Sequence, residues 1–157
     1  MVVGRAFDLL ESRGDVDPSR LAFVGHDYGA MYGTLLMGVD RRPKAYVLMA
    51  ATPRHADWNI PFWLGPAGMS PAEQRAYKEA LAPLDPITQV AMAAPAAILF
   101  QFGREDFYIS APTGLEFFYA ATDPKAIEPY DAGHPLNDEA MQAGLTWLRD
   151  QLIEAWS

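Results

Sequence analysis

The chain has 157 residues, of which 50% are hydrophobic and 20% are charged, and its formal net charge is −8 at pH 7. This length and composition are typical of one globular domain that buries roughly 70% of its extended surface, and we predict a single domain over residues 1–157. The acidic balance argues against nucleic acid and anionic membrane surfaces as partners. The sequence has no cysteine, which excludes disulfides, thiolate nucleophiles and cysteine-bound metals. Its first residues lack the pattern of a signal peptide and no apolar run reaches the length of a membrane span, so we expect a cytoplasmic protein.

The apolar pattern of the first third predicts a helix, a strand, a helix and a strand. Apolar residues recur at helical spacing over 2–13, and the short continuous apolar runs at 21–24 and 45–50 are typical of buried strands. The segment 30–36, between these strands, is predicted to be helical.

The segment 52–95 is predicted to leave the sheet as an excursion. Ser70 and Glu73 have the spacing of a capping box, with Pro71 at the first helical position, which predicts a helix up to about Leu81. A shorter helix is expected to begin at Asp85.

The last third predicts a strand at 97–102, a helix at 113–121, a strand at 126–130 and a closing helix at 137–156. Four apolar residues of the closing helix recur on one face, which we expect to be buried: Met141, Leu145, Leu148 and Leu152.

Strands that alternate with helices imply an α/β fold with about four parallel strands flanked by helices. Pro129 cannot donate a ladder hydrogen bond, which predicts that the fourth strand lies at a sheet edge. The loops that follow parallel strands lie on one side of such a sheet, where ligands bind.

One such loop contains Gly25-His26-Asp27-Tyr28-Gly29, between the first strand and the following helix. In isolation this is a tight turn, but a strand before it and a helix after it are typical of a nucleophile elbow, which holds its central residue in a strained, exposed conformation. That central residue is Asp27, where Ser or Cys is usual.

Two further loops carry an acid and a base. Glu105 and Asp106 follow the third strand, and His134 follows the fourth. Asp27, Asp106 and His134 are therefore expected to converge in the order nucleophile, acid and base. Glu105 is expected to be a solvated neighbour.

These motifs resemble the C-terminal half of an α/β-hydrolase, and they are closest to the dienelactone-hydrolase-like group. The matching pieces are 20–30, 99–106 and 132–134, and the resemblance extends over nearly the whole chain. It implies a truncated α/β-hydrolase fold, with Asp27 at the nucleophile position, Asp106 as the triad acid and His134 as the triad histidine.

The sequence departs from that family in two ways. With a carboxylate at the elbow, the chain resembles haloalkane dehalogenases and epoxide hydrolases. Those families usually place Trp where this chain has Tyr28. The family's first four strands, and the loop that supplies a second oxyanion donor, have no counterpart in the chain. The backbone N–H of Tyr28 is then the expected oxyanion donor.

Three other side chains, those of His26, Trp58 and Trp63, are candidates for supporting or lining the site. His26 is expected to support the elbow and His55 to be a solvated loop residue. Trp58 and Trp63, in the excursion, either line a substrate pocket or simply pack on the sheet. The histidine spacing does not favour zinc, and we expect no metal and no cofactor.

We therefore expect a hydrolase that acts on a small, uncharged or weakly polar ester-like molecule. Two alternatives remain: haloalkane dehalogenase or epoxide hydrolase chemistry, and a non-catalytic binding or scaffold module derived from a hydrolase. Because the strand before the elbow would be an open apolar edge, we also expect a homodimer through that edge.

Overall fold

The computed structural model describes residues 2–153. They contain one parallel sheet of four strands in the order β1-β2-β3-β4. The strands are β1 (Ala22–His26), β2 (Ala45–Met49), β3 (Ala97–Gly103) and β4 (Lys125–Tyr130). This is a parallel α/β sheet, as predicted, and every predicted strand is present within two residues of its expected bounds.

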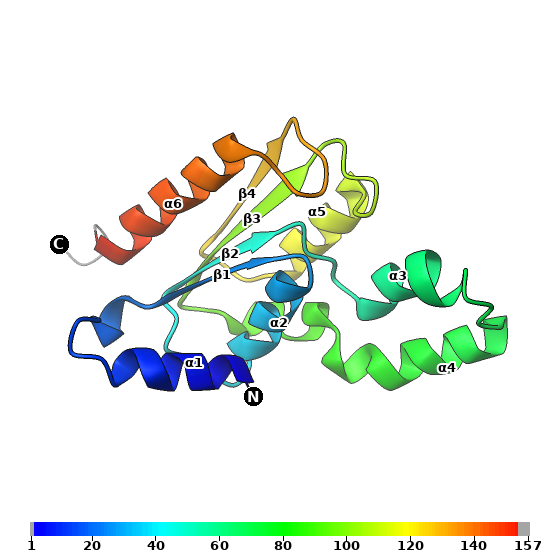
Figure 1. Cartoon of the computed structure of the whole chain (residues 1–157), viewed down its shortest axis with the longest axis horizontal. Coiled ribbons are helices and arrows are strands. Elements are labelled where there is room, and N and C mark those ends of the chain that lie inside the picture. The colour runs from blue at the N-terminus through cyan, green and yellow to red at the C-terminus, as the bar shows by residue number, and fades with distance from the viewer. Residues whose placement is uncertain (1, 154–157) are drawn as a thin grey trace.

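The helices are α1 (Val2–Glu11), α2 (Tyr28–Met37), α3 (His55–Asn59), α4 (Pro71–Leu81), α5 (Ala111–Ala120) and α6 (Asp138–Ile153). Figure 1 shows α6 on one face of the sheet and α2 and α5 on the other. The closing helix was expected to reach residue 156, and its last part lies outside the described residues. None of the helices described is long and apolar enough to cross a membrane.

The position of Pro129 at a sheet edge is confirmed. It lies in β4, the last strand of the sheet, where it is in register with Phe102 of β3. The strand before the elbow, β1, forms the opposite edge. Both central strands are buried along their whole length, which explains their continuous apolar sequences.

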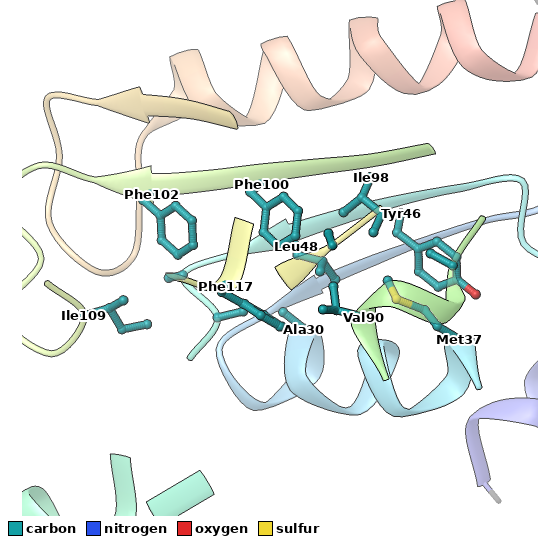
Figure 2. Close-up of a cluster of buried hydrophobic side chains, with 14 of the residues drawn as sticks. Ala30, Met37, Tyr46, Leu48, Val90, Ile98, Phe100, Phe102, Ile109 and Phe117 are labelled. Carbon is teal, nitrogen blue, oxygen red and sulfur yellow. The ribbon is translucent and has the colours of Figure 1, made fainter. Parts of the chain in front are cut away.

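The main core fills the space between the sheet and the helices α2 and α5 (Figure 2). Tyr46 and Leu48 of β2 and Phe100 of β3 meet Met37 of α2 and Phe117 of α5 there. This packing holds the parallel strands in place. The three loops that carry the site therefore lie together beyond the C-terminal ends of the strands.

The expectation for the closing helix was partly wrong. Leu148 is buried, but Met141 and Leu145 are exposed, and α6 contacts the sheet through Ala140 and Gly144 instead. Small residues allow the helix axis to approach the sheet closely, which leaves the larger side chains at the margin of the contact.

The excursion contains helical segments that were predicted and others that were not. The capping box of α4 is confirmed, because the Ser70 side chain accepts from the Glu73 backbone and the Glu73 side chain accepts from the Ser70 backbone. The expected short helix after Asp85 is one 3₁₀ turn at Pro86–Thr88. The short helix α3 and the π-helical segment Ile60–Leu64 that follows it were not predicted.

Candidate active site

Asp27 lies in the candidate elbow, the turn between β1 and α2, in a strained backbone conformation with φ 53° and ψ −121°. Its N–H donates to the Met49 carbonyl at 2.9 Å, and its own carbonyl accepts from Met31 N at 3.1 Å as the first bond of α2. A Cβ at Gly25 would lie 2.6 Å from Ala30 N, so only glycine permits the close approach of β1 and α2. At Gly29 a Cβ would meet open space, and close packing does not require that glycine.

The structure brings His134 to both carboxylates. Its Nδ1 lies 2.9 Å from Asp106 Oδ2, and its Nε2 lies 3.7 Å from Asp27 Oδ2. The β3 and β4 loops are adjacent, because a Cβ at Gly103 would lie only 2.3 Å from the Ala132 carbonyl oxygen. The close approach at Gly103 explains how residues of two separate strand ends come into contact.

Asp106 is a buried, fully engaged carboxylate. Its side chain has no solvent exposure, and Oδ1 accepts the backbone N–H groups of Tyr108 at 2.8 Å and Ile109 at 3.1 Å. Its Oδ2 atom therefore accepts the Nδ1–H of His134. That assignment leaves Nε2 as a lone-pair acceptor directed toward Asp27. Glu105 is exposed, as expected.

His26 supports the histidine loop. Its Nε2–H donates to the backbone carbonyl of His134 at 2.8 Å, and the two rings lie 5.0 Å apart. The sequence analysis expected His26 to support the elbow. The structure instead gives His26 the role of holding the His134 backbone beside β1.

Of the two candidate tryptophans, the structure brings Trp58 to the site. The Trp58 ring is 5% exposed and lies 5.0 Å from the His134 ring and 4.8 Å from the Tyr108 ring. Trp63 is 58% exposed and has no ring contact with these residues in the described part of the chain.

Tyr28 has two separate roles. Its backbone N–H precedes the first helical hydrogen bond of α2 and remains available to a ligand. Its hydroxyl donates to Asn59 Oδ1, and Asn59 Nδ2 donates to the Tyr77 hydroxyl at 2.7 Å. Burial raises the pKa of Tyr28, which keeps this hydroxyl protonated. The elbow is thereby tied to α3 and α4.

The expectation for His55 was wrong. It is buried as the first residue of α3, and its backbone N–H donates to Asp85 Oδ1 at 2.9 Å. Its ring packs 6.4 Å from that of Tyr28. The contact with Asp85 joins positions thirty residues apart, and no local sequence signal indicates it.

The sequence analysis missed three residues of this site: Tyr108, Asn59 and Tyr77. Tyr108 follows Asp106 closely in the chain, and this proximity was an available signal. Asn59 and Tyr77 approach the elbow only through the fold of the excursion, which has no repeating pattern from which their positions can be inferred.

Four buried side-chain polar atoms in residues 2–153 have no hydrogen-bond partner: Asp27 Oδ1, Trp58 Nε1, Gln101 Oε1 and His134 Nε2. An unsatisfied buried polar group costs about 1–3 kcal/mol. Three of the four belong to the site just described, whereas Gln101 lies in β3 beneath α6 and uses its amide nitrogen for Tyr130 and Ala140. Such a concentration is typical of a place built for a ligand.

Two other kinds of site, a metal site and the cavity at the other end of the strands, were compared with this one. Among the described residues, no group of three His, Asp or Glu side chains is placed to hold a metal ion. A cavity of about 640 Å³ lies at the other end of the strands, beside Lys44, Tyr46, Pro95 and Pro124. It contains none of the Asp27, Asp106 or His134 side chains, and we therefore do not assign it to catalysis.

No protein-family model matches the sequence, and no curated protein does either. Solved structures do match. An acetyl xylan esterase from Paenibacillus sp. R4 is 23% identical with a TM-score of 0.74, over 92% of this chain and 49% of that one. A 2,6-dihydroxy-pseudo-oxynicotine hydrolase is 14% identical with a TM-score of 0.76, over 98% and 46%. Acetyl xylan esterase 1 from Thermoanaerobacterium sp. JW/SL YS485 is 14% identical with a TM-score of 0.72, over 94% and 50%.

These matches concern the fold. The chain spans about half the length of each of these three structures, and all three are named as esterases or hydrolases. The four parallel strands and their flanking helices therefore have the α/β-hydrolase fold, of which this chain spans about half.

Proposed function

We propose that this chain hydrolyses a small ester-like molecule, with Asp27, His134 and Asp106 as its catalytic residues. The observation that carries the proposal is the alignment of His134 between the two carboxylates, with Nδ1 2.9 Å from Asp106 and Nε2 3.7 Å from Asp27. The likeness of the fold to esterases and the resemblance of the three motifs to dienelactone-hydrolase-like proteins support it.

In this reaction His134 acts as the base. Asp106 holds the proton on Nδ1, and Nε2 takes a proton from a water molecule oriented by Asp27. The water oxygen attacks the carbonyl carbon, and negative charge develops on the carbonyl oxygen near the Tyr28 N–H. The carbon–oxygen bond then breaks, and His134 returns the proton to the leaving alkoxide. The products are a carboxylic acid and an alcohol.

The surroundings favour an uncharged substrate. Aromatic rings of Trp58 and Tyr108 cover His134. Two arginines lie close in sequence to His55 and Asp106, and both are paired with carboxylates: Arg54 with Glu116 at 2.5 Å and Arg104 with Asp131 at 2.7 Å. The aromatic rings are apolar and both arginines are already paired, so no free positive charge among them would attract an anionic substrate.

Turnover of short-chain aryl esters tests this proposal. We expect measurable hydrolysis by the wild-type chain and a loss of roughly 10²–10⁴-fold in kcat for His134→Ala, since the base is removed. Circular dichroism and a thermal melt verify that the variant is folded. Activity that survives His134→Ala would contradict the proposal.

A second reaction is favoured by the carboxylate at the elbow. Asp27 could attack a saturated carbon of a haloalkane or epoxide and form an ester, which water activated by His134 then hydrolyses. Attack on an ester carbonyl would instead give an anhydride, which is why we assign Asp27 to orienting water in ester hydrolysis.

Isotope labelling separates the two reactions. A single turnover in ¹⁸O-water leaves the label in the Asp27 carboxylate if Asp27 attacks covalently, and in the product acid if it orients water. Asp27→Ser is expected to retain or raise esterase activity, because it restores the commoner nucleophile for acyl transfer. Failure to turn over any ester, epoxide or haloalkane would support a non-catalytic module.

A further inference from the structure

Trp58 carries a buried donor that the reaction described above does not use. The side chain is 5% exposed, and its Nε1–H has no acceptor among the described residues. The other unpartnered atoms of the site, Asp27 Oδ1 and His134 Nε2, are acceptors. Trp58 therefore adds the one unpartnered side-chain donor to this group.

The indole is held in place by its neighbours. Its ring lies 5.0 Å from that of His134 and 6.2 Å from that of Tyr28. Phe62 and Tyr108 pack against it at 5.7 Å and 4.8 Å. Rings of the site therefore surround the indole, and this packing resists rotation of the N–H toward solvent.

Ester hydrolysis needs donors at the carbonyl oxygen, because negative charge develops there. The elbow supplies the backbone N–H of Tyr28, from the first residue of α2. Trp58 comes from α3, a different element. The Trp58 ring lies 5.0 Å from the ring of His134, the proposed base, and 6.2 Å from the ring of Tyr28.

We propose that the Trp58 Nε1–H is the second oxyanion donor of this site and that it selects substrates with a carbonyl group at the reacting carbon. This inference rests on the proposed hydrolase function. The donor is a side chain of the excursion, so the excursion completes the catalytic site as well as covering it.

Trp58→Phe removes the N–H and keeps an aromatic ring. We expect kcat for an aryl ester to fall roughly 10²–10³-fold, the usual effect of losing one oxyanion donor, with little change in KM. Trp63→Phe is the matched control, because Trp63 is exposed in the same excursion, and its kcat should remain at the wild-type value. A Trp58→Phe kcat within threefold of wild type would overturn the inference.

A thionoester substrate distinguishes a hydrogen-bond donor from a residue that only positions His134. Sulfur accepts hydrogen bonds more weakly than oxygen, so the ratio of ester to thionoester turnover should fall in Trp58→Phe. Equal slowing of both substrates would assign Trp58 to packing and contradict the proposed donor.

Binding of a non-hydrolysable carbonyl compound tests the donor without turnover. In the wild-type protein, acetophenone should shift the indole ¹H–¹⁵N resonance of Trp58, assigned by its absence in Trp58→Phe, and leave that of Trp63 in place. A shift without any ester turnover would support the donor and reject the proposed function. Turnover without a shift at Trp58 would reject the donor alone, and the absence of both would reject both.

Discussion

The Nε2 atom of His134 faces the Oδ2 atom of Asp27 at 3.7 Å, which is beyond direct hydrogen-bond range. Because Nδ1–H is donated to Asp106, both facing atoms are acceptors. This spacing suits a group that can donate to both of them, such as a water molecule or a hydroxyl. The relationship supports our proposal that His134 is the base, and under that proposal the tautomer set by Asp106 matters.

Replacement of Asp106 by Asn is expected to lower kcat by roughly 10³–10⁴-fold. The Asn carbonyl can still accept the N–H groups of Tyr108 and Ile109, but its amide donates to His134 Nδ1 and favours the wrong tautomer. Stability should change little, as measured by thermal unfolding. Asp131→Asn is the control, because that carboxylate is exposed and pairs only with Arg104 among the described residues. Equal activity of the two variants would contradict this role for Asp106.

The two elbow glycines should respond differently to alanine. Gly25→Ala places a Cβ 2.6 Å from backbone atoms of Ala30 and Gly29. Backbone cannot move aside cheaply, so we expect a loss of several kcal/mol in the free energy of unfolding or a failure to fold. Gly29→Ala meets open space within α2, and it should be neutral or stabilising by about 0.5–1 kcal/mol. Urea unfolding of both variants tests the difference, and an equal loss in both would contradict the packing argument.

Tyr130 should make stability sensitive to alkaline pH. Burial, and then its hydrogen bond to Glu128, raise the pKa of Tyr130 to about 12. A pKa raised in the folded state means that the unfolded chain releases this proton first, so stability is full below about pH 10 and is lost as pH rises toward 12.

Tyr130→Phe isolates this effect. At pH 7 the variant should be less stable by about 1 kcal/mol, since the Tyr130 hydroxyl no longer accepts from Gln101 Nε2 at 2.8 Å. Between pH 10 and 12 the wild type should lose up to about 2–3 kcal/mol relative to the variant. Urea unfolding across this range measures the difference, and a constant difference at all pH values would count against it.

The homodimer through β1 stays a prediction. The outer edge of β1 pairs with no strand of the described sheet, and Val24 in its middle is 47% exposed. An apolar groove beside Val24 is lined by Met49 and by Met141 and Leu145 of α6. We expect a second copy of the chain to cover this edge, with a total buried area of about 1,600 Å² or more.

Sedimentation at micromolar concentration tests the dimer. The wild type should sediment as a dimer and Val24→Lys as a monomer, because a charge in an apolar interface is costly. Val39→Lys is the control, since Val39 is 74% exposed in the turn that follows α2. A wild-type chain that sediments as a folded monomer would reject the prediction.

The order of strands and helices could be predicted from sequence because the signals are local. Apolar runs, helical spacing and the capping box at Ser70 and Glu73 act over a few residues. The turn between β1 and α2 was predictable for the same reason, since Gly25 and Asp27 lie where a clear strand meets a clear helix. Asp106 and His134 were predictable once the sheet was known to be parallel, because each follows a strand that ends at the same edge.

The tertiary structure decided which other side chains reach His134. Trp58 and Trp63 are equal candidates in sequence, yet only Trp58 packs on His134, because the short helix α3 turns it toward the β4 loop. His26 supports His134 through a contact between distant positions. The excursion has no repeating pattern, and its conformation is set by contacts such as Tyr28 with Asn59, between residues far apart in sequence. Long-range packing of this kind, absent from any local window of sequence, decides how the site is completed.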